Sequence, residues 1–549
     1  MCKEVLPGDT FRVNTELFIR LAPMVSPLMQ RIQVYTHFFF VPYRLLWEHW
    51  EDFITQSVQG YSSQPVPKQL PTATLHDVSS DDSNYYKYFK SGSLSDYLGL
   101  NISQLDVGVK PVAPIVEGKN WTFQYLPHLA YQKIWNDFYR DENLQEPDFI
   151  PAQDGNYVID EDNTPIPDFE LQLWNLRYRS WKKDYFTSAL PWTQKGPDIT
   201  LPLGGTVPVR GTSINGIAGQ TEASTFRADL SGLAITSGGP TTEETRQAYF
   251  SIDPVSNMRL LYDGEDLTKK QAYTYQETDK LINLPPLNVA LTSAVADLSC
   301  ATPTTINELR RAFALQRWEE LNARGGTRYV EQLAAHFGVR PRDSRLQRAE
   351  YLGGGVSDVQ ISEVLQTSET ATTPQGHMSG HGVSASFNHA FKRYFEEHGV
   401  VLGIMSIMPK ANYYQGVDRM FLKRGVYDFG WPSLAHLGEQ PIYQEELFAN
   451  DGIPLNVETD SPVFGYTPRY AEYKFSNDQI HGDFRTSLSN WHAGRSFANL
   501  PMLNWQFISG ANFKPAVFSV DDVDPFWCQI YNDIKVSRKL PKFGTPSII

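Results

Sequence analysis

The stretch FRVNTELFIR, residues 11–20, alternates between side chains of two kinds. Its odd positions are apolar or threonine, and its even positions are mostly polar. A period of two predicts a strand with one buried face. Near the other end of the chain, FWCQIYNDIKV at residues 526–536 alternates in a similar way. Because two such strands can belong to one sheet system, we expect a single framework that uses both ends of the chain.

A second stretch, QRIQVYTHFFFV at residues 30–41, is apolar on both faces and is typical of a central strand. Between these strands lie segments that are much longer than ordinary loops. Residues 195–281 are rich in Gly, Thr and Ser and indicate an inserted surface loop, and Gly353–Gly355 are expected to break the chain. The pattern predicts one all-β sandwich over residues 1–549, with long insertion loops that carry short helices.

The strongest helical signals lie in an arginine-rich segment, residues 304–351, which we expect to be a helical insertion. A capping box predicts that a helix begins after Thr305, and a second helix is predicted over Tyr329–Phe337, ending at Gly338. The first helix has an apolar stripe that we expect to be buried, made of Ile306, Leu309, Phe313, Trp318 and Leu321.

Composition narrows the functional class. The chain has 549 residues and a net charge of -14, which argues against a protein that coats nucleic acid over its whole surface. Three cysteines cannot supply a disulfide framework, so we expect assembly in a reducing cytoplasm. No apolar run is long enough for a signal peptide or a membrane helix, so we expect a soluble protein without membrane insertion. Aromatic residues, at 13%, favour strands and large contact surfaces.

Catalytic and metal-binding motifs are weak. A zinc site could use His377, His381, His389 and His398, but flanking glycines favour a loop over the helix that would align the first two. Asp154, Asp160 and Asp162 lack the spacing of a calcium loop, although a divalent ion between subunits stays open. We find no nucleotide-binding or nucleophile motif. The sequence therefore predicts no catalytic residue, no metal site, no cofactor and no enzyme activity.

Positive charge is concentrated in two places. Arginine suits carboxylates and phosphates equally, and in residues 304–351 we favour ion pairs within the chain or between subunits. The proposed intersubunit residues are Arg310, Arg311, Arg317, Trp318, Arg324 and Arg328. The second cluster is a basic C-terminal tail that could contact DNA phosphates or simply aid solubility, made of Lys535, Arg538, Lys539 and Lys542.

Ordered blocks over nearly the whole chain resemble one family, the major capsid proteins of the Microviridae, in their gokushovirus-like branch. The blocks include EVLPGDTF (4–11), THFFFVPYRLLWEHWEDF (36–53), AYQKIWNDFYRDENLQ (130–145), DYFTSALPWTQKG (184–196), TINELRRAFALQRW (305–318), RGVYDFGWPSLAHLGEQ (424–440), VFGYTPRYAEYKF (463–475) and HGDFRTSLSNWHAG (481–494). Family members usually carry an arm before the first block, where this sequence has three residues. It also has Ala493-Gly494-Arg495 where the family often has a Leu-Ala-Gln-like run.

The resemblance implies an eight-stranded antiparallel jelly roll. It implies self-assembly with other capsid subunits into a T=1 icosahedral virion around circular single-stranded DNA, after synthesis in the bacterial cytoplasm. Minor virion proteins and a host cell-surface receptor are the further implied partners. The insertion at residues 195–281 falls where the family forms threefold protrusions proposed to contact the host.

Two other functions remain as alternatives at this stage. A secreted β-sandwich that binds or cleaves polysaccharide would also use many aromatic residues, and it requires two opposed carboxylates if it is a hydrolase. A free single-strand DNA-binding protein would bind as a monomer with strong salt dependence, but the net charge makes this the weakest alternative.

Overall fold

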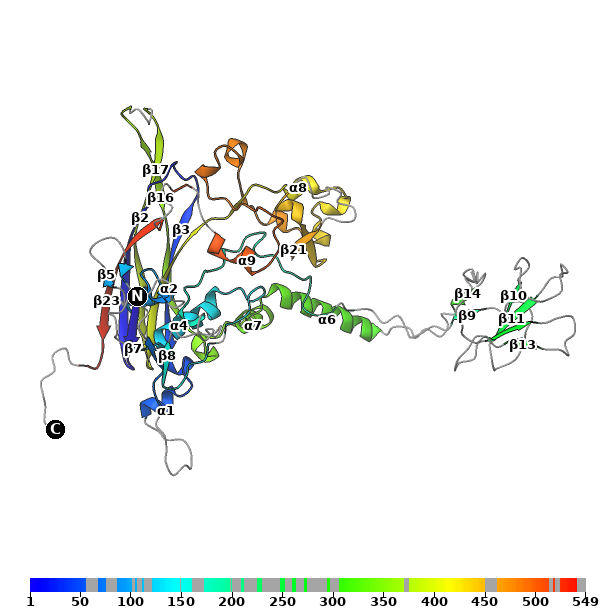
Figure 1. The fold of residues 1–549 in the computed structure, drawn as a ribbon, viewed down its shortest axis with the longest axis horizontal. Coiled ribbons are helices and arrows are strands. Elements are labelled where there is room, and N and C mark those ends of the chain that lie inside the picture. The colour runs from blue at the N-terminus through cyan, green and yellow to red at the C-terminus, as the bar shows by residue number, and fades with distance from the viewer. Residues whose placement is uncertain are drawn as a thin grey trace, which may run out of the picture. The chain divides into compact units, whose positions relative to one another are not determined.

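Two four-stranded sheets form the framework of the protein (Figure 1). In the computed structural model, every neighbouring pair within these two sheets is antiparallel. The first sheet contains, in spatial order, β1 (Cys2–Val5), β18 (Gly399–Pro409), β3 (Ile32–Pro42) and β15 (Glu350–Asp358). The second contains β16 (Gln360–Leu365), β17 (Met378–Tyr394), β2 (Thr10–Leu21) and β23 (Phe526–Ser537).

The chain divides into two compact units, which we describe separately. Unit 1 comprises Met1–Asp198 and Ala314–Ile549, and unit 2 comprises Ile199–Phe313. The structure describes residues 1–55, 68–75, 86–100, 104–105, 111–112, 121–148, 150–159, 172–197, 199, 306–369, 375–449, 462–512, 517–518 and 524–540, together with six short strands between 209 and 296. Within these ranges no helix has the length and apolar character needed to cross a bilayer.

The predicted strand at residues 11–20 is β2, and it lies between β17 and β23. Its register pairs Phe11 with Val536 and Ile19 with Cys528. The expectation that the two ends of the sequence share one sheet is therefore confirmed. Because β23 lies at the sheet edge, most of its side chains stay exposed, although its sequence alternates as a half-buried strand would.

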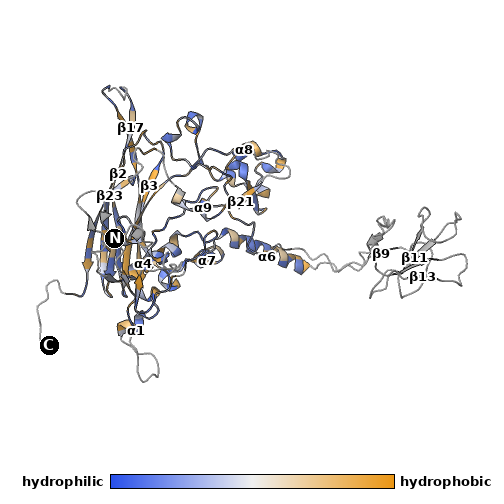
Figure 2. Ribbon diagram, viewed as in Figure 1, coloured by the Kyte–Doolittle hydropathy of each residue, from blue (hydrophilic) through white to orange (hydrophobic). Residues whose placement is uncertain are grey.

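The core of the sandwich lies between the two sheets. Phe11 and Val13 of β2 pack in one buried cluster with Phe38 and Phe40 of β3. Farther along the same strands, a second cluster joins Leu17, Ile19 and Leu21 to Ile32 and Val34. Figure 2 shows hydrophobic residues along the strands of both sheets. Inward positions at every second residue thus explain why the period-two pattern is so clear in β2.

β3 is a central strand with cover on both faces, as predicted. Its face opposite the sandwich core carries Phe39 and Val41, which belong to a third buried cluster. That cluster also includes Leu126 and Leu129 of α4 (Leu126–Ile134), a helix that continues as a π-helical turn over Trp135–Tyr139. One outer face of the sandwich is therefore buried under inserted segments.

Gly353–Gly355 do not break the chain, contrary to prediction, because they lie inside β15. A β-carbon on Gly354 would sit 2.0 Å from the carbonyl oxygen of Thr36 in β3, and one on Gly355 would meet the side-chain amide of Asn388. The glycines are thus needed for close approach of the backbones.

The remaining elements of unit 1 are short, apart from α6, whose residues up to Phe313 belong to unit 2. α7 (Tyr329–Phe337) ends as predicted at Gly338, which adopts the left-handed conformation. The other helices are α1 (Trp50–Thr55), α2 (Tyr86–Phe89), α3 (Leu94–Leu98), α6 (Ile306–Arg324), α8 (Arg419–Leu422) and α9 (Trp505–Ile508). A small three-stranded sheet contains β7 (Trp121–Gln124), β4 (Thr72–Leu75) and β8 (Asn156–Ile159). The two-stranded sheets are β20 (Glu439–Tyr443) with β21 (Val463–Pro468), β19 (Asn412–Tyr413) with β22 (Asp478–Gln479), and β5 (Gln104–Leu105) with β6 (Pro111–Val112).

Unit 2 contains most of the predicted insertion at residues 195–281. Its larger sheet is an antiparallel meander of β10 (Thr225–Asp229), β11 (Gln247–Ser251), β12 (Arg259–Tyr262) and β13 (Gln271–Tyr273). A separate antiparallel pair, β9 (Val209–Gly211) and β14 (Ala294–Ala296), brackets the meander in the sequence.

We expect Gly354→Ala to destabilise the fold by about 1–3 kcal/mol, because the added methyl group forces β15 away from β3. Urea denaturation of purified chain measures this loss. Gly425→Ala is the matched control, since its β-carbon would meet only ordinary van der Waals contact. Equal stability of the two variants would contradict the close approach.

Acid is expected to destabilise the core through His128 of α4. Complete burial lowers the pKa of this imidazole from 6.5 to about 3. Between these two values the unfolded chain binds a proton that the folded chain rejects, so stability falls as the pH falls. We expect the free energy of unfolding to fall by about 2 kcal/mol through this group between pH 7 and pH 5.

Urea midpoints of wild type and His128→Gln at both pH values measure this fall in stability. The exposed-site variant His436→Gln is the control, and equal acid sensitivity in the wild type and His128→Gln would contradict the assignment.

Candidate functional site

Helix α6 exposes the apolar stripe that we expected to be buried. Ile306, Phe313 and Trp318 are 70%, 65% and 54% exposed. The prediction failed because the part of α6 that belongs to unit 1 packs through its other side, where Glu319 and Ala323 are buried. Figure 2 shows hydrophobic and hydrophilic residues interspersed along α6. An exposed aromatic stripe of this kind is typical of a contact surface.

The arginines of the predicted interface separate into two groups. Arg324 forms an ion pair with Glu439, whose side chain is fully buried, and Arg328 binds Glu142 at 2.9 Å. These two arginines pair within the chain. Removing Arg324 would leave the buried carboxylate of Glu439 without its ion-pair partner, whereas Glu142 would keep a second partner, Arg140. Arg310, Arg311 and Arg317 are exposed on α6 and form no ion pair with any described residue. Their role between subunits stays a prediction.

The basic C-terminal residues also differ in environment. Lys535 is largely exposed and lies 3.6 Å from Asp533. Arg538 donates two hydrogen bonds, of 2.7 and 3.3 Å, to the buried carboxylate of Asp9. This bidentate pair ties the end of β23 to the turn before β2. Lys539 packs its aliphatic chain near Gly8, and Lys542 lies outside the described residues.

The candidate metal ligands are dispersed. His381 and His389 lie on β17, and the Nδ1 atom of His389 is 2.7 Å from the amide oxygen of Asn14. The ring of His398 contacts Trp50. Across the described ranges, no three His, Cys, Asp or Glu side chains gather as a metal site would require.

Asp154, the one described member of the acidic trio, accepts hydrogen bonds from Trp47 at 2.7 Å and Lys68 at 3.1 Å. These two donors lower the pKa of its carboxyl group against the opposing effect of partial burial. Asp160 and Asp162 lie outside the described residues. Asp154 therefore has a local structural role.

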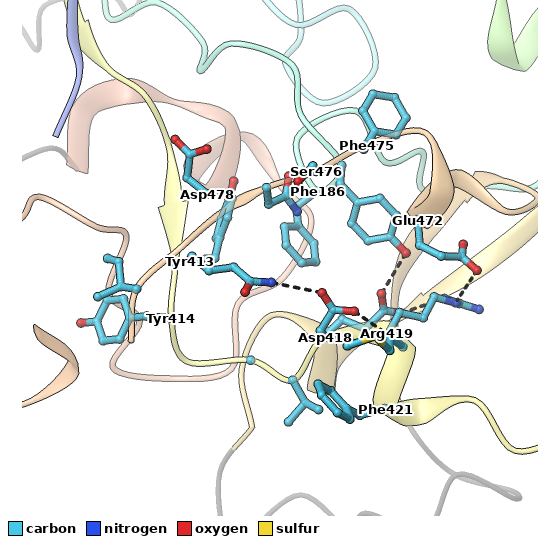
Figure 3. Close-up of a pocket in the computed structure, with 18 of the residues that line it drawn as sticks. Phe186, Tyr413, Tyr414, Asp418, Arg419, Phe421, Glu472, Phe475, Ser476 and Asp478 are labelled. Atoms are coloured by element: carbon cyan, nitrogen blue, oxygen red, sulfur yellow. Dashed lines mark hydrogen bonds and ion pairs between the residues drawn. The ribbon is translucent and has the colours of Figure 1, made fainter. Parts of the chain in front are cut away.

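A cavity of about 700 Å³ lies among the loops that follow β18. Figure 3 shows aromatic rings along its wall, including Phe186 and Tyr413, and charged groups at one side. Arg419 of α8 contacts Glu446 at 2.7 Å and Glu472 at 4.0 Å. Lys423 adds a contact of 3.2 Å to Glu472. Two cations and two carboxylates therefore balance one another inside this cavity.

The chemistry of this network is structural. Burial raises the pKa of Glu446, and the adjacent Arg419 guanidinium opposes that rise. The hydroxyl of Tyr185 donates a hydrogen bond of 2.8 Å to the same carboxylate. Polysaccharide cleavage needs one free acid and one free base or nucleophile, whereas both glutamates here are held by cations. The network therefore connects α8 to the neighbouring loops.

The outward face of the second sheet contains residues that sequence reasoning did not bring together. Arg12 of β2 lies directly opposite Lys392 on one side and Lys535 on the other. Alternation along residues 11–20 placed Arg12 outward, but no local pattern revealed its neighbours. Only the register between distant strands does so.

A β-sandwich with an exposed aromatic helix and dispersed arginines is typical of a structural subunit, a protein that works through its surfaces. Comparison with known proteins gives the family. The model of the capsid protein (F protein) family matches residues 1–548, and the chain belongs to this family. It is thus a structural capsid protein, located in the virion and assembling with other capsid subunits.

Three relatives are each described as capsid protein VP1. That of Chlamydia phage 1 is 34% identical, covering 99% of this chain and 91% of the relative. That of Bdellovibrio phage phiMH2K is also 34% identical, covering 92% and 83%. That of Spiroplasma virus 4 is 28% identical, covering 99% and 90%. The resemblance to Microviridae capsid proteins is therefore confirmed.

Proposed function

We propose that this chain forms a T=1 icosahedral shell around circular single-stranded DNA, and that it reaches this state by self-assembly in the bacterial cytoplasm. The observation that carries the proposal is a two-sheet sandwich joined to an exposed aromatic helix. Such a subunit has a rigid body and an uncovered contact surface. Minor virion proteins are proposed as further components of the particle.

The two four-stranded sheets support an eight-stranded jelly roll. The chain enters the second sheet at β2, crosses to the first at β3, and returns through β15 to the hairpin of β16 and β17. It then crosses again to β18 and finishes at β23. Repeated crossing between two antiparallel sheets is what a jelly roll requires.

Contact between subunits is assigned to the exposed face of α6. Stable interfaces are centred on aromatic and arginine side chains, and the exposed residues of α6 include Phe313 and Trp318 together with Arg310, Arg311 and Arg317. Acidic groups on a neighbouring subunit would pair with the arginines, which suits a chain with a net charge of -14. A structural divalent cation between subunits is compatible with this arrangement.

Contact with a host cell-surface receptor is assigned to unit 2. The pairing of Gly211 with Ala294 brings the two ends of the intervening segment together. A segment whose ends meet can project from a shell without altering the framework. This supports a protrusion at the threefold axes that presents the insertion to the host.

Assembly tests the proposed role of α6. The double variant Phe313→Ser/Trp318→Ser is expected to keep the wild-type urea midpoint, because both side chains are mostly exposed. The concentration needed to form particles is expected to rise at least about tenfold, since truncating a central aromatic contact costs about 2 kcal/mol. Electron microscopy and light scattering measure particle formation.

Tyr178→Ser, at another aromatic residue that is 63% exposed, is the matched control. Particles that form from the double variant at wild-type concentration would remove α6 from the interface. A wild-type chain that stays monomeric at high concentration would overturn the shell itself.

Replacing residues 212–293 with a short Gly-Ser turn is expected to leave assembly intact, because β9 and β14 remain paired at the base of the insertion. Image reconstruction of the variant particles should show density missing at the threefold axes. Adsorption to host cells, followed by sedimentation, is expected to be lost. If the variant fails to assemble, unit 2 belongs to the shell.

A further inference from the structure

The two outer faces of the sandwich differ in a way that the shell function leaves unexplained. The outer face of the first sheet is buried under α4 and its neighbours. The outer face of β17, β2 and β23 remains exposed and carries large aromatic side chains. Phe387, Tyr531 and Trp527 are 63%, 58% and 48% exposed. We call this surface the β17-β2-β23 face.

The register arranges this face in five transverse rows. Each row contains one residue from β17, one from β2 and one from β23. The rows are Lys392-Arg12-Lys535, His389-Asn14-Asp533, Phe387-Glu16-Tyr531, Ala385-Phe18-Gln529 and Val383-Arg20-Trp527. Hydrogen bonds across the second row, from Asn14 to Asp533 at 3.3 Å and between Asn14 and His389 at 2.7 Å, confirm that these side chains share one face.

The first row places three cations side by side. Residues directly opposite each other in neighbouring strands have their β-carbons about 5 Å apart, and like charges in such positions repel. Arg12 and Lys392 form no hydrogen bond or ion pair with any described residue, and Lys535 has only the 3.6 Å contact to Asp533. The row is therefore unfavourable in the isolated chain and would be relieved by an anion.

The whole face is basic in an acidic protein. Its cations are Arg12, Arg20, Lys392 and Lys535, and its acids are Glu16 and Asp533, so its net charge is +2, whereas the chain carries -14. The phenylalanine, tyrosine and tryptophan rings lie in the last three rows, and Arg20 shares the fifth row with Trp527. Positive charge beside exposed rings suits a strand of unpaired nucleotides, because phosphates pair with the cations while bases stack on the rings.

We propose that the β17-β2-β23 face binds single-stranded DNA, with phosphates at the Lys392-Arg12-Lys535 row and bases against Phe387, Tyr531 and Trp527. The inference rests on the proposed function, because the shell must enclose single-stranded DNA for this face to meet it. Duplex DNA is the poorer partner, since its paired bases do not expose their faces to the rings. A second copy of the chain would need an acidic surface to cover the cation row.

Binding of a fluorescein-labelled oligothymidylate to unassembled full chain tests the proposal by fluorescence anisotropy over a range of salt concentrations. The test variant is Arg12→Gln/Lys392→Gln/Lys535→Gln. Its affinity at low salt is expected to fall at least about tenfold. The slope of log K against log salt is expected to become shallower by about 2, which corresponds to three lost phosphate contacts on a single strand.

Two further variants separate charge from stacking. Arg310→Gln/Arg311→Gln/Arg317→Gln removes the same charge from α6 and is expected to leave affinity and slope unchanged. Phe387→Ser/Tyr531→Ser is expected to weaken binding about tenfold without altering the slope, because it removes rings and no charge. If the two triple variants lost equal affinity for the oligonucleotide, binding would depend on overall charge and the proposal would be overturned.

A measurement on wild-type chain keeps the test independent of variant folding. Photocrosslinking to a bromodeoxyuridine oligonucleotide, followed by mass spectrometry, should label peptides from residues 378–394 and 526–537. Labels found only elsewhere would overturn the proposal. The proposal would also be overturned if Arg12→Gln/Lys392→Gln/Lys535→Gln bound the oligonucleotide normally but could not form particles. That result would make the face a subunit contact. Particle formation is scored separately, so a wild-type chain that binds the oligonucleotide without assembling overturns only the shell.

Discussion

The pairing of β2 with β17 and β23 is the contact on which the rest of the structure depends. It joins residues 10–21 to residues 383–394 on one side and 526–537 on the other. Closing such long loops costs entropy before any packing is gained, so folding is governed by distant contacts. Once both sheets have formed, the ends of the long insertions after β3 and β18 are held in place. The insertions then need only pack on the framework or extend from it.

The sandwich uses its two outer faces differently. Phe39 and Val41 turn one face of β3 into a support for α4, which anchors the inserted segments of unit 1. The corresponding face of β2 carries Arg12, Phe18 and Arg20 and stays exposed. One framework thereby has a structural side and a free side. The network around Arg419 also has a structural role, because its charges are neutralised by ion pairs within the chain.

Local physics made much of the fold predictable. Alternation identified β2, a run that is apolar on both faces identified β3, and a glycine identified the end of α7, because these patterns depend on neighbours in sequence. Gly354 was misread because its small size serves a backbone on another strand. The α6 stripe was misread because periodicity shows that a face is apolar but not what covers it.

The candidate site was less predictable for the same reason. Lys535 and the α6 arginines were found as charge clusters in the sequence, but the structure commits Arg538, Arg324 and Arg328 to partners within the chain. Lys392 lies opposite Arg12 only because of the register between two strands that are far apart in the sequence. No single segment of sequence contains that information.

The position of β23 has a consequence for synthesis. Translation delivers β2 early, β17 much later and β23 as the last described strand, so β2 has two unpaired edges until β17 is made and one until β23 follows. An unpaired edge favours aggregation, and a chain truncated before residue 526 never loses it. The bond between Arg538 and Asp9 closes the same junction. A fragment that ends before β23 therefore keeps an exposed strand edge that is covered in the chain with β23.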